Sequence, residues 1–256
     1  MAIDKEIIMD KKRSIFAVLK PYLTIFLAEV LGTMILIFVG CGSGIKFDGD
    51  VPVSHHLDAL GFGLAVLLAI QIFGHITACH INPTVSITSL LLGYITYIEF
   101  VAYILAQFVG SVLGFVLLKL IFPENYIPSG FCMTKLADGI TVTRGFFIEL
   151  VITCLLCFVL CSVWDARNAT KGDSVAIRFA FVVTILSIIA GPLTGASMNT
   201  ARSYGPAVFG SNSDWKDQWI YWTAPNISPF ISFAIYKVFF SEPATQESKK
   251  RKRRCF

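Results

Sequence analysis

Two stretches of this sequence share one pattern: GHITACHINPT at residues 74–84 and GPLTGASMNTAR at residues 191–202. A shift of 117 residues superposes three pairs of identical residues, Gly74/Gly191, Thr77/Thr194 and Asn82/Asn199. Each stretch follows a long apolar run and ends in a shorter, moderately apolar one. Because shared apolar composition does not readily produce a matching Asn, the two stretches indicate an internal repeat.

The repeat extends toward the start of each half. A shift of 120 residues aligns 26–41 with 146–161 and matches Phe26/Phe146, Glu29/Glu149, Thr33/Thr153, Leu36/Leu156, Phe38/Phe158, Val39/Val159 and Cys41/Cys161. Apolar composition alone could give the Leu, Val and Phe matches, but it does not readily place Glu opposite Glu. The chain therefore consists of two related halves.

The composition places both halves in a membrane. Of the 256 residues, 55% are hydrophobic and 15% are charged, and the mean hydropathy is +0.70. Soluble domains have about 45–50% apolar and roughly 25% charged residues. A soluble protein of this length would expose large apolar patches. This composition and hydropathy exclude a cytosolic enzyme, a disordered chain and a disulfide scaffold, and they predict an integral membrane protein.

Six apolar runs are long enough to cross a bilayer core of about 30 Å as helices. They are Tyr22–Cys41, Leu57–Ile76, Tyr94–Leu118, Gly145–Val163, Val175–Gly191 and Gln218–Phe240. Runs of this length exclude a β-barrel. Two further stretches, His80–Gly93 and Met198–Gly210, are too short to cross and too apolar for ordinary loops. This pattern predicts an all-α membrane protein with six transmembrane helices and two re-entrant half-helices.

The spans also predict how the halves are oriented. Each half holds three spans, an odd number, so the halves must enter the membrane from opposite sides. Such an inverted repeat places the functional site near the midplane, where the halves meet. The two predicted half-helices, one from each face, are the elements that can meet there.

Basic residues indicate which face is cytosolic. They gather before the first span, in the connection at 164–174 and at the end of the chain: Lys5, Lys11, Lys12, Arg13, Lys20, Arg167, Lys171, Lys249, Lys250, Arg251, Lys252, Arg253 and Arg254. Since positive residues accumulate inside, both termini are predicted to be cytosolic. A net charge of +4 concentrated at the ends suggests anionic membrane lipids as partners and not nucleic acid.

Glu29 and Glu149 fall in the middle of predicted spans. An ionised side chain that faces lipid there costs roughly a few kcal/mol or more. One explanation is a proton relay. The other is that each carboxylate accepts hydrogen bonds from the irregular backbone of the adjacent re-entrant loop, whose donors would otherwise be unpaired. The symmetric placement of the two residues favours this loop-bracing role.

These features resemble the aquaporin (major intrinsic protein) family over about residues 20–240. The resemblance rests on the duplicated Asn-Pro-Ala-like boxes, the two Glu residues, Gly74-His75 and Gln107. It implies a passive channel and a homotetramer with one pore per protomer, with no catalysis, cofactor or metal. For His75 and His80 a metal site or a pH gate is one interpretation, and bracing of the first re-entrant loop is the favoured one.

The chemistry of the boxes agrees with the resemblance. Asn82 and Asn199 each precede a half-helix as good caps and are the expected pore asparagines. Both half-helix dipoles would then point their positive ends at the bilayer centre and oppose cations. The boxes nevertheless depart from Asn-Pro-Ala: the first continues with Pro83 and Thr84, and the second with Thr200 and Ala201. Thr200 replaces a proline whose fixed φ suits the first helical position, and it restores a backbone donor.

By resemblance, four positions spaced from the boxes form the selectivity filter: Phe62, Ser187, Ala196 and Arg202. An intramembrane Arg must face a cavity or a partner, and its fixed donors can hold water or hydroxyl oxygens. Phe62 would supply an apolar wall. Strict water channels of the family usually carry His where Ser187 stands. The small side chains of Ser187 and Ala196 therefore predict a filter wide enough for glycerol and urea.

Other family markers favour a water-selective channel. Glycerol channels typically carry Asp after the filter Arg, a basic residue four positions on and a Pro–Leu pair in the last span. Here the positions hold Ser203, Ala207 and Tyr221-Trp222, the water-channel pattern. A water-channel frame with an opened filter is similar to the insect glycerol-conducting aquaporins (entomoglyceroporins). Because steric exclusion occurs where a pore is narrowest, the filter decides, and a channel for water, glycerol and urea is predicted.

Three alternatives remain open for the function: a strictly water-selective channel, an ion-conducting or junctional relative, and a secondary transporter coupled through Glu29 or Glu149. The expected domains are a cytosolic segment at 1–21, a channel domain at 22–240 with repeats at about 22–121 and 143–240, and a basic cytosolic tail at 241–256. The expected location is the plasma membrane.

Overall fold

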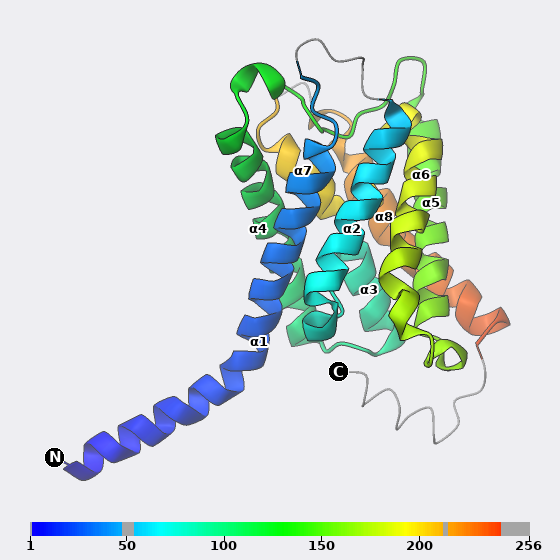
Figure 1. Cartoon of the computed structure of the whole chain (residues 1–256). Helices are drawn as coiled ribbons and strands as arrows, with labels where there is room; N and C mark the ends of the chain where they lie inside the picture. Colours follow the sequence, from blue (N-terminus) through cyan, green and yellow to red (C-terminus); the bar gives the residue numbers. More distant parts are fainter. Residues whose placement is uncertain (1, 48–53, 212–214, 242–256) are drawn as a thin grey trace.

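The computed structural model describes residues 2–47, 54–211 and 215–241, with side chains at position 15 and from 17 onward in these ranges. The basic tail predicted at 241–256 therefore lies outside the described residues beyond Ser241. In the described ranges the chain forms helices and no strand, as predicted (Figure 1). The α-helices are α1 (Ala2–Gly42), α2 (His55–Thr77), α3 (Pro83–Leu92), α4 (Tyr97–Ile121), α5 (Val142–Val163), α6 (Val175–Thr194), α7 (Thr200–Ala207) and α8 (Gln218–Phe239).

Five of the six predicted spans are helices that suit a bilayer by both length and apolarity. They cover Ala17–Gly42, His55–Thr77, Tyr97–Ile121, Val142–Val163 and Gly172–Thr194. The sixth, α8, has 22 residues and is long enough, but its composition is more polar than that of the other five. Several of its polar groups bond within the protein: Ser232 Oγ, for example, donates to the Cys154 carbonyl at 3.1 Å. A helix whose polar side chains are paired in this way can still cross a bilayer.

The helix ends differ from the predicted ones where local capping decides them. The third span begins at Tyr97 and not at Tyr94, because Thr96 and Glu99 form a capping box. The second half-helix ends at Ala207, three residues before the predicted end. At the other extreme, α1 begins at Ala2, so the predicted N-terminal segment continues the first span as a helix that extends away from the bundle (Figure 1).

The packing repeats between the two halves. Helix α1 contacts α2 and α4, and the equivalent α5 contacts α6 and α8. Each half-helix packs on a helix of the other half: α3 of the first half packs on α8, and α7 of the second half packs on α4. In Figure 1, α3 lies in the lower part of the bundle and α7 in the upper part, while α1 enters and α8 ends at the lower end. The structure thus shows the inverted repeat that the sequence predicts.

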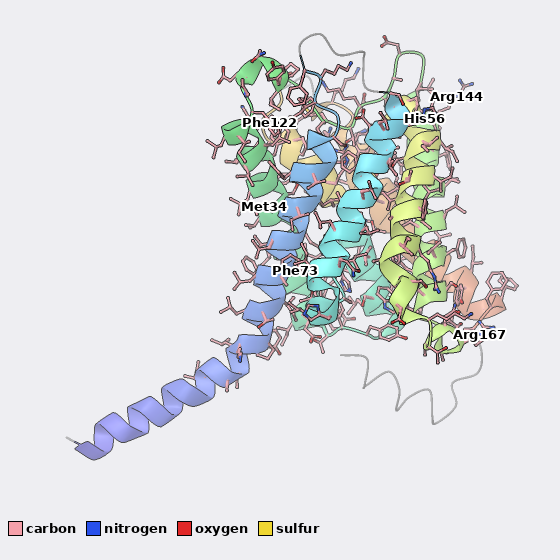
Figure 2. All side chains as sticks on the ribbon, in the orientation of Figure 1. Met34, His56, Phe73, Phe122, Arg144 and Arg167 are labelled. Atoms are coloured by element: carbon pink, nitrogen blue, oxygen red, sulfur yellow. A yellow bond between two sulfur atoms is a disulfide. The ribbon has the colours of Figure 1, made fainter. Side chains whose placement is uncertain are left out.

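Side chains mark the two ends of the bundle. His56 and Arg144 lie at the upper end and Arg167 lies at the lower end (Figure 2). Arg167 is held there by two bonds to the carboxylate of Asp165, from Nε at 2.8 Å and from Nη2 at 2.7 Å. This pairing lowers the pKa of Asp165 to about 2, mainly through the hydrogen bonds from Arg167, so the carboxylate stays ionised at neutral pH.

Glycines let two helices of the first half approach closely. A Cβ atom placed on Gly110 of α4 would lie 2.3 Å from the carbonyl oxygen of Val30 in α1. One turn further on, a Cβ on Gly114 would lie 2.6 Å from the carbonyl oxygen of Met34. Both distances are too short for a side chain, so α4 lies directly against the backbone of α1. Small residues serve the same purpose at helix interfaces of other membrane proteins.

Prolines inside the helices remove backbone donors, and side chains of other elements replace them. In α8, Pro225 cannot donate to the Tyr221 carbonyl and Pro229 cannot donate to the Pro225 carbonyl. Thr200 Oγ1 donates to the Tyr221 carbonyl at 3.1 Å, and Thr84 Oγ1 donates to the Pro225 carbonyl at 3.0 Å. Both hydroxyls are the ones that distinguish the two boxes from Asn-Pro-Ala.

In helix α6, a side chain likewise replaces a backbone donor that a proline removes. Pro192 leaves the Ile188 carbonyl without its helical donor. His55 Nε2 lies 3.2 Å from this carbonyl and 3.0 Å from that of Ser187. Since both partners are acceptors, Nε2 carries the proton. The first residue of α2 thereby holds the part of α6 that presents Ser187.

The glycine contact yields a stability prediction. Replacing Gly110 by Val should lower the free energy of unfolding by about 2 kcal/mol or more, because the new side chain must push α4 away from α1. The measurement is thermal unfolding of the purified protein in detergent. As a matched control on the same helix, Leu113→Ala changes a lipid-facing residue that is 44% exposed and should shift the midpoint much less. Equal shifts for the two variants would contradict the close contact.

The threonine contacts yield a second prediction. Thr84→Val and Thr200→Val should each destabilise the protein by about 1–3 kcal/mol, because each leaves a buried carbonyl without a donor. Thr84→Ser and Thr200→Ser keep the hydroxyl and should retain most of the stability. Thr223→Val, at a half-buried position of α8 whose hydroxyl bonds within its own helix, serves as the control. If the Ser and Val variants unfold at the same temperature, the hydroxyls do not support α8.

Candidate functional site

A cavity of about 950 Å³ is lined by residues from both ends of the bundle. At one end its wall includes Asp58, Phe131 and Cys132, and at the other it includes Trp164 and Asp165. Both re-entrant loops and the two predicted pore asparagines line it between these ends. The cavity therefore follows the line along which the two halves meet.

Asn82 and Asn199 occupy equivalent positions at the centre of this cavity. Asn82 Oδ1 accepts a bond from the Thr84 N–H at 2.9 Å, and Asn199 Oδ1 accepts one from the Arg202 N–H at 3.0 Å, so each caps its half-helix as expected. Asn82 Nδ2 donates to the Met198 carbonyl at 2.9 Å. Asn199 Nδ2 returns the same bond to Ile81 at 2.9 Å. Each amide thus ties the two loops together with one of its two N–H groups and keeps a second donor beside the cavity.

Glu29 braces the first loop from inside the bundle. Its carboxylate accepts bonds from the backbone N–H groups of His80 at 2.8 Å and Ile81 at 2.7 Å. Thr77 Oγ1 and Gln107 Nε2 donate to the same carboxylate at 3.1 and 2.9 Å. The side chain is fully buried, so these four donors replace its water shell.

Glu149 repeats this arrangement in the second loop. It accepts from the backbone N–H groups of Ser197 at 2.9 Å and Met198 at 3.0 Å, and from Thr194 Oγ1 at 2.6 Å. The donors are the residues equivalent to those that bind Glu29. The structure therefore places both Glu residues in contact with the loop backbone, as the bracing interpretation expects, and not in the wall of the cavity.

Both loops carry strained backbone in matching positions. Cys79 and Ile81 have φ of 50° and 47°, and the equivalent Ala196 and Met198 have φ of 44° and 50°. Such left-handed non-Gly residues cost about 1–3 kcal/mol each. The four carboxylate oxygens of Glu29 and Glu149 hold this conformation, and it turns the Ile81 and Met198 carbonyls toward the opposing asparagines.

Of the two histidines expected to brace the first loop, the structure buries His80 and leaves His75 exposed. His75 is exposed at the end of α2 and lines the cavity. His80 is buried, its Nδ1 lies 3.1 Å from Ser86 Oγ, and its ring stacks on Tyr103 with centroids 4.2 Å apart. Both candidates lie near the loop in sequence, and only the fold shows which ring turns inward. In the described part of the chain no three His, Cys, Asp or Glu side chains gather into a metal site.

The four predicted filter residues all line the cavity. The guanidinium carbon of Arg202 lies 4.5 Å from the centre of the Phe62 ring. Phe62 is fixed in turn by α1, because a Cβ on Gly40 would come within 2.6 Å of its ring. Ser187 and Ala196 are both buried small residues, 7% and 6% exposed. The structure thus brings together residues from α2, α6, the second loop and α7.

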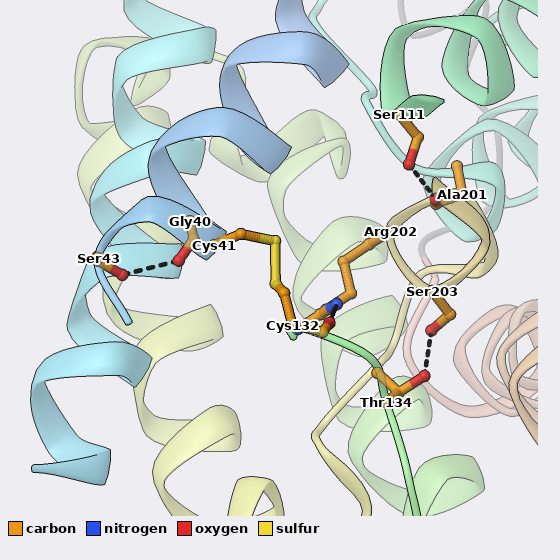
Figure 3. Close-up of a disulfide and its surroundings, with 9 residues drawn as sticks. All are labelled: Gly40, Cys41, Ser43, Ser111, Cys132, Thr134, Ala201, Arg202 and Ser203. Atoms are coloured by element: carbon orange, nitrogen blue, oxygen red, sulfur yellow. Dashed lines mark hydrogen bonds between the residues drawn. A yellow bond between two sulfur atoms is a disulfide. The ribbon is translucent and has the colours of Figure 1, made fainter. Parts of the chain in front are cut away.

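A loop that the sequence did not single out also contacts these residues. Residues of the connection between α4 and α5 reach the cavity, and the Cys132 carbonyl accepts a 2.7 Å bond from Arg202 Nη1. Cys132 also forms a disulfide with Cys41 at the end of α1. Beside it, Thr134 Oγ1 donates to Ser203 Oγ at 2.9 Å (Figure 3). Ser203, where glycerol channels typically carry Asp, is therefore part of a hydroxyl network that holds this loop.

Comparisons with known proteins agree with this geometry. The family model for the major intrinsic protein matches residues 18–236. Aquaporin-4 of Mus musculus is 35% identical over 232 residues, which cover 90% of this chain and 70% of that protein. Aquaporin-2 of Bos taurus is 31% identical over 227 residues, which cover 88% of this chain and 81% of that protein.

A solved structure supports the fold independently. The aquaglyceroporin from Plasmodium falciparum superposes with a TM-score of 0.75 over 85% of this chain and 96% of its own, at 23% sequence identity. The chain therefore belongs to the major intrinsic protein family, the aquaporins, whose members are membrane channels and not enzymes.

Proposed function

We propose that this channel conducts glycerol and urea as well as water. The observation that carries the proposal is the small Ser187 side chain in the wall shared with Arg202 and Phe62. No hydrogen bond joins its hydroxyl to another described residue, so the hydroxyl is available to a solute. Ala196 adds no polar group and little volume. A polyol could place its carbon side on Phe62 while its hydroxyls bind Arg202 and Ser187.

We assign the remaining site residues by what they touch. Asn82 and Asn199 offer donors to solute oxygens at the midplane. Pro83, Thr84, Thr200 and Ala201 form the first turns that aim both half-helix dipoles at this point. The positive potential of these dipoles and of Arg202 opposes cations and a continuous proton wire. Glu29 and Glu149 act by holding the loops.

The disulfide supports the proposed orientation, with both termini cytosolic. Disulfides persist in oxidising compartments and are rare in the cytosol. Cys41 lies at the end of α1 opposite to the end that leads to the N-terminus, which is consistent with a cytosolic N-terminus. Six spans bring the C-terminus to the same side. We also propose that the protein lies in the plasma membrane, that its channel domain covers residues 22–240 and that it forms a homotetramer.

Flux measurements on the purified protein in liposomes test the proposal. Stopped-flow light scattering with water, glycerol and urea gradients should show all three permeabilities above those of empty liposomes, without saturation and without dependence on an ion gradient. Water flux without glycerol flux would identify a water-selective channel. Saturable uptake driven by an ion gradient would identify a transporter, and ionic currents without solute flux would identify an ion-conducting relative.

The filter assignment makes a sharper prediction. Ser187→His should lower glycerol permeability by about tenfold or more while water still passes, because the ring narrows the pore beside Arg202. Ser187→Ala keeps the pore wide and should retain most of the glycerol flux. Ile189→Phe adds a ring at a lipid-facing position of the same helix, 61% exposed, and should leave both fluxes unchanged. Unchanged glycerol flux in Ser187→His would show that Ser187 is not in the filter.

A further inference from the structure

We propose that the disulfide between Cys41 and Cys132 positions the guanidinium of Arg202 and thereby sets the solute selectivity of the pore. This inference rests on the proposed function, because it concerns the same filter. It gives a role in permeation to two residues that lie far from both boxes in the sequence. The disulfide joins Cys41 to Cys132, and a hydrogen bond joins the Cys132 carbonyl to Arg202 in the wall of the cavity (Figure 3).

The first step is the covalent link between a rigid helix and a loop. Cys41 is 1% exposed in the last turn of α1, where it packs with Ile37 and Phe115. Cys132 lies in the connection between α4 and α5, 91 residues away in sequence and 5.5 Å away between Cα atoms. The disulfide therefore fixes a point of this loop to a wall of the bundle.

The second step leads from the loop to the filter. The carbonyl of Cys132 itself accepts the 2.7 Å bond from Arg202 Nη1. On its other side, the guanidinium contacts the Phe62 ring at 4.5 Å. Among the described residues, this carbonyl is the one hydrogen-bond acceptor of the guanidinium. The charged group is thus held between a ring that belongs to α2 and a carbonyl that the disulfide tethers.

The tether matters because the carbonyl belongs to an irregular segment. Cys132 has φ of 60°, a left-handed conformation that non-Gly residues seldom adopt without support. Downstream, Thr134 is anchored by its bond to Ser203 and by the Gln218 side chain, which donates to its carbonyl at 3.0 Å. Upstream, the disulfide is the corresponding anchor. Without it, the peptide group between Cys132 and Met133 keeps the 3.3 Å bond from the Met133 N–H to the Gly130 carbonyl, a contact within the same loop, and can move with that loop and withdraw the acceptor from Arg202.

The consequence for permeation follows from the size of the Arg side chain. A guanidinium without its partner regains rotamer freedom and can turn across the pore. Such positions narrow the opening beside Ser187 for part of the time. Glycerol needs the full width and water does not, so glycerol flux should fall more than water flux when the disulfide is absent.

A purely stabilising disulfide would behave differently. It would lower the unfolding temperature when removed, and the number of active channels would fall for every solute alike. The ratio of glycerol to water permeability is independent of the number of active channels. It therefore separates the positioning role from the stabilising one.

The test uses the full chain in liposomes. We compare the oxidised wild type, Cys41→Ser/Cys132→Ser and wild type treated with tris(2-carboxyethyl)phosphine. In the treated sample the S–S bond is replaced by two S–H groups, and the phosphine is oxidised to its oxide with an oxygen atom from water. The glycerol-to-water ratio should fall about fivefold in both samples that lack the disulfide, the effect of one lost hydrogen bond. A ratio that is unchanged or raised would overturn the proposal.

Two further arms keep the result specific. Cys154→Ser changes a free, half-buried cysteine of α5 and should leave both the ratio and its response to phosphine as in wild type. In an Arg202→Ala background, removal of the disulfide should no longer change the ratio, because the coupling passes through Arg202. A persistent change in that background would overturn the proposed path. Absence of glycerol flux in the oxidised wild type would overturn the proposed function and this inference together.

Discussion

The structure depends on one constraint: at membrane depth, every backbone polar group needs a partner inside the protein. Helices meet this requirement by themselves, but the two loops before α3 and α7 do not. Their N–H groups are bonded by the carboxylates of Glu29 and Glu149, and their carbonyls are bonded by the amides of Asn199 and Asn82. The buried Glu side chains thereby allow irregular backbone, and hence a polar site, at the middle of the membrane.

The same constraint explains how the boxes can depart from the usual family sequence. Three prolines in α6 and α8 each leave one carbonyl without a donor, and His55, Thr84 and Thr200 supply the missing bonds. The two Thr residues thus connect each half-helix to α8. Thr200 also accepts a 3.0 Å bond from Asn226 Nδ2, a second polar contact between α7 and this part of α8. The departures change which group satisfies a carbonyl and keep the half-helices in place.

Much of this arrangement could be predicted from the sequence because polar residues in apolar runs are few and repeated. Glu29 and Glu149, and likewise Asn82 and Asn199, stand out against their surroundings, and their spacing reveals the inverted repeat. Cys132 carries no such signal, since it lies in a loop and has no counterpart in the other half. The different surroundings of His75 and His80 also needed the fold, because the left-handed residues between them decide which ring points inward. The sixth span was predicted as an apolar run like the other five, and α8 ends within one residue of it, but its composition is more polar than theirs.

The repeat also shows how the proposed filter differs from the equivalent region of the other half. The shift of 117 residues pairs each residue of the proposed filter with a residue of the other half. Phe62 corresponds to Phe179, Ser187 to Ile70, Ala196 to Cys79 and Arg202 to Val85. All of these residues line the cavity. The two halves therefore contribute two equivalent sets of residues to the cavity wall, but the set that contains Ile70 and Val85 has no fixed strong donors. In the proposed filter, that set can restrict a solute only by width, whereas the set that contains Arg202 can also replace the hydrogen bonds that a solute loses on leaving water. The proposed selectivity of this symmetric fold thus rests on residues in which its two halves differ.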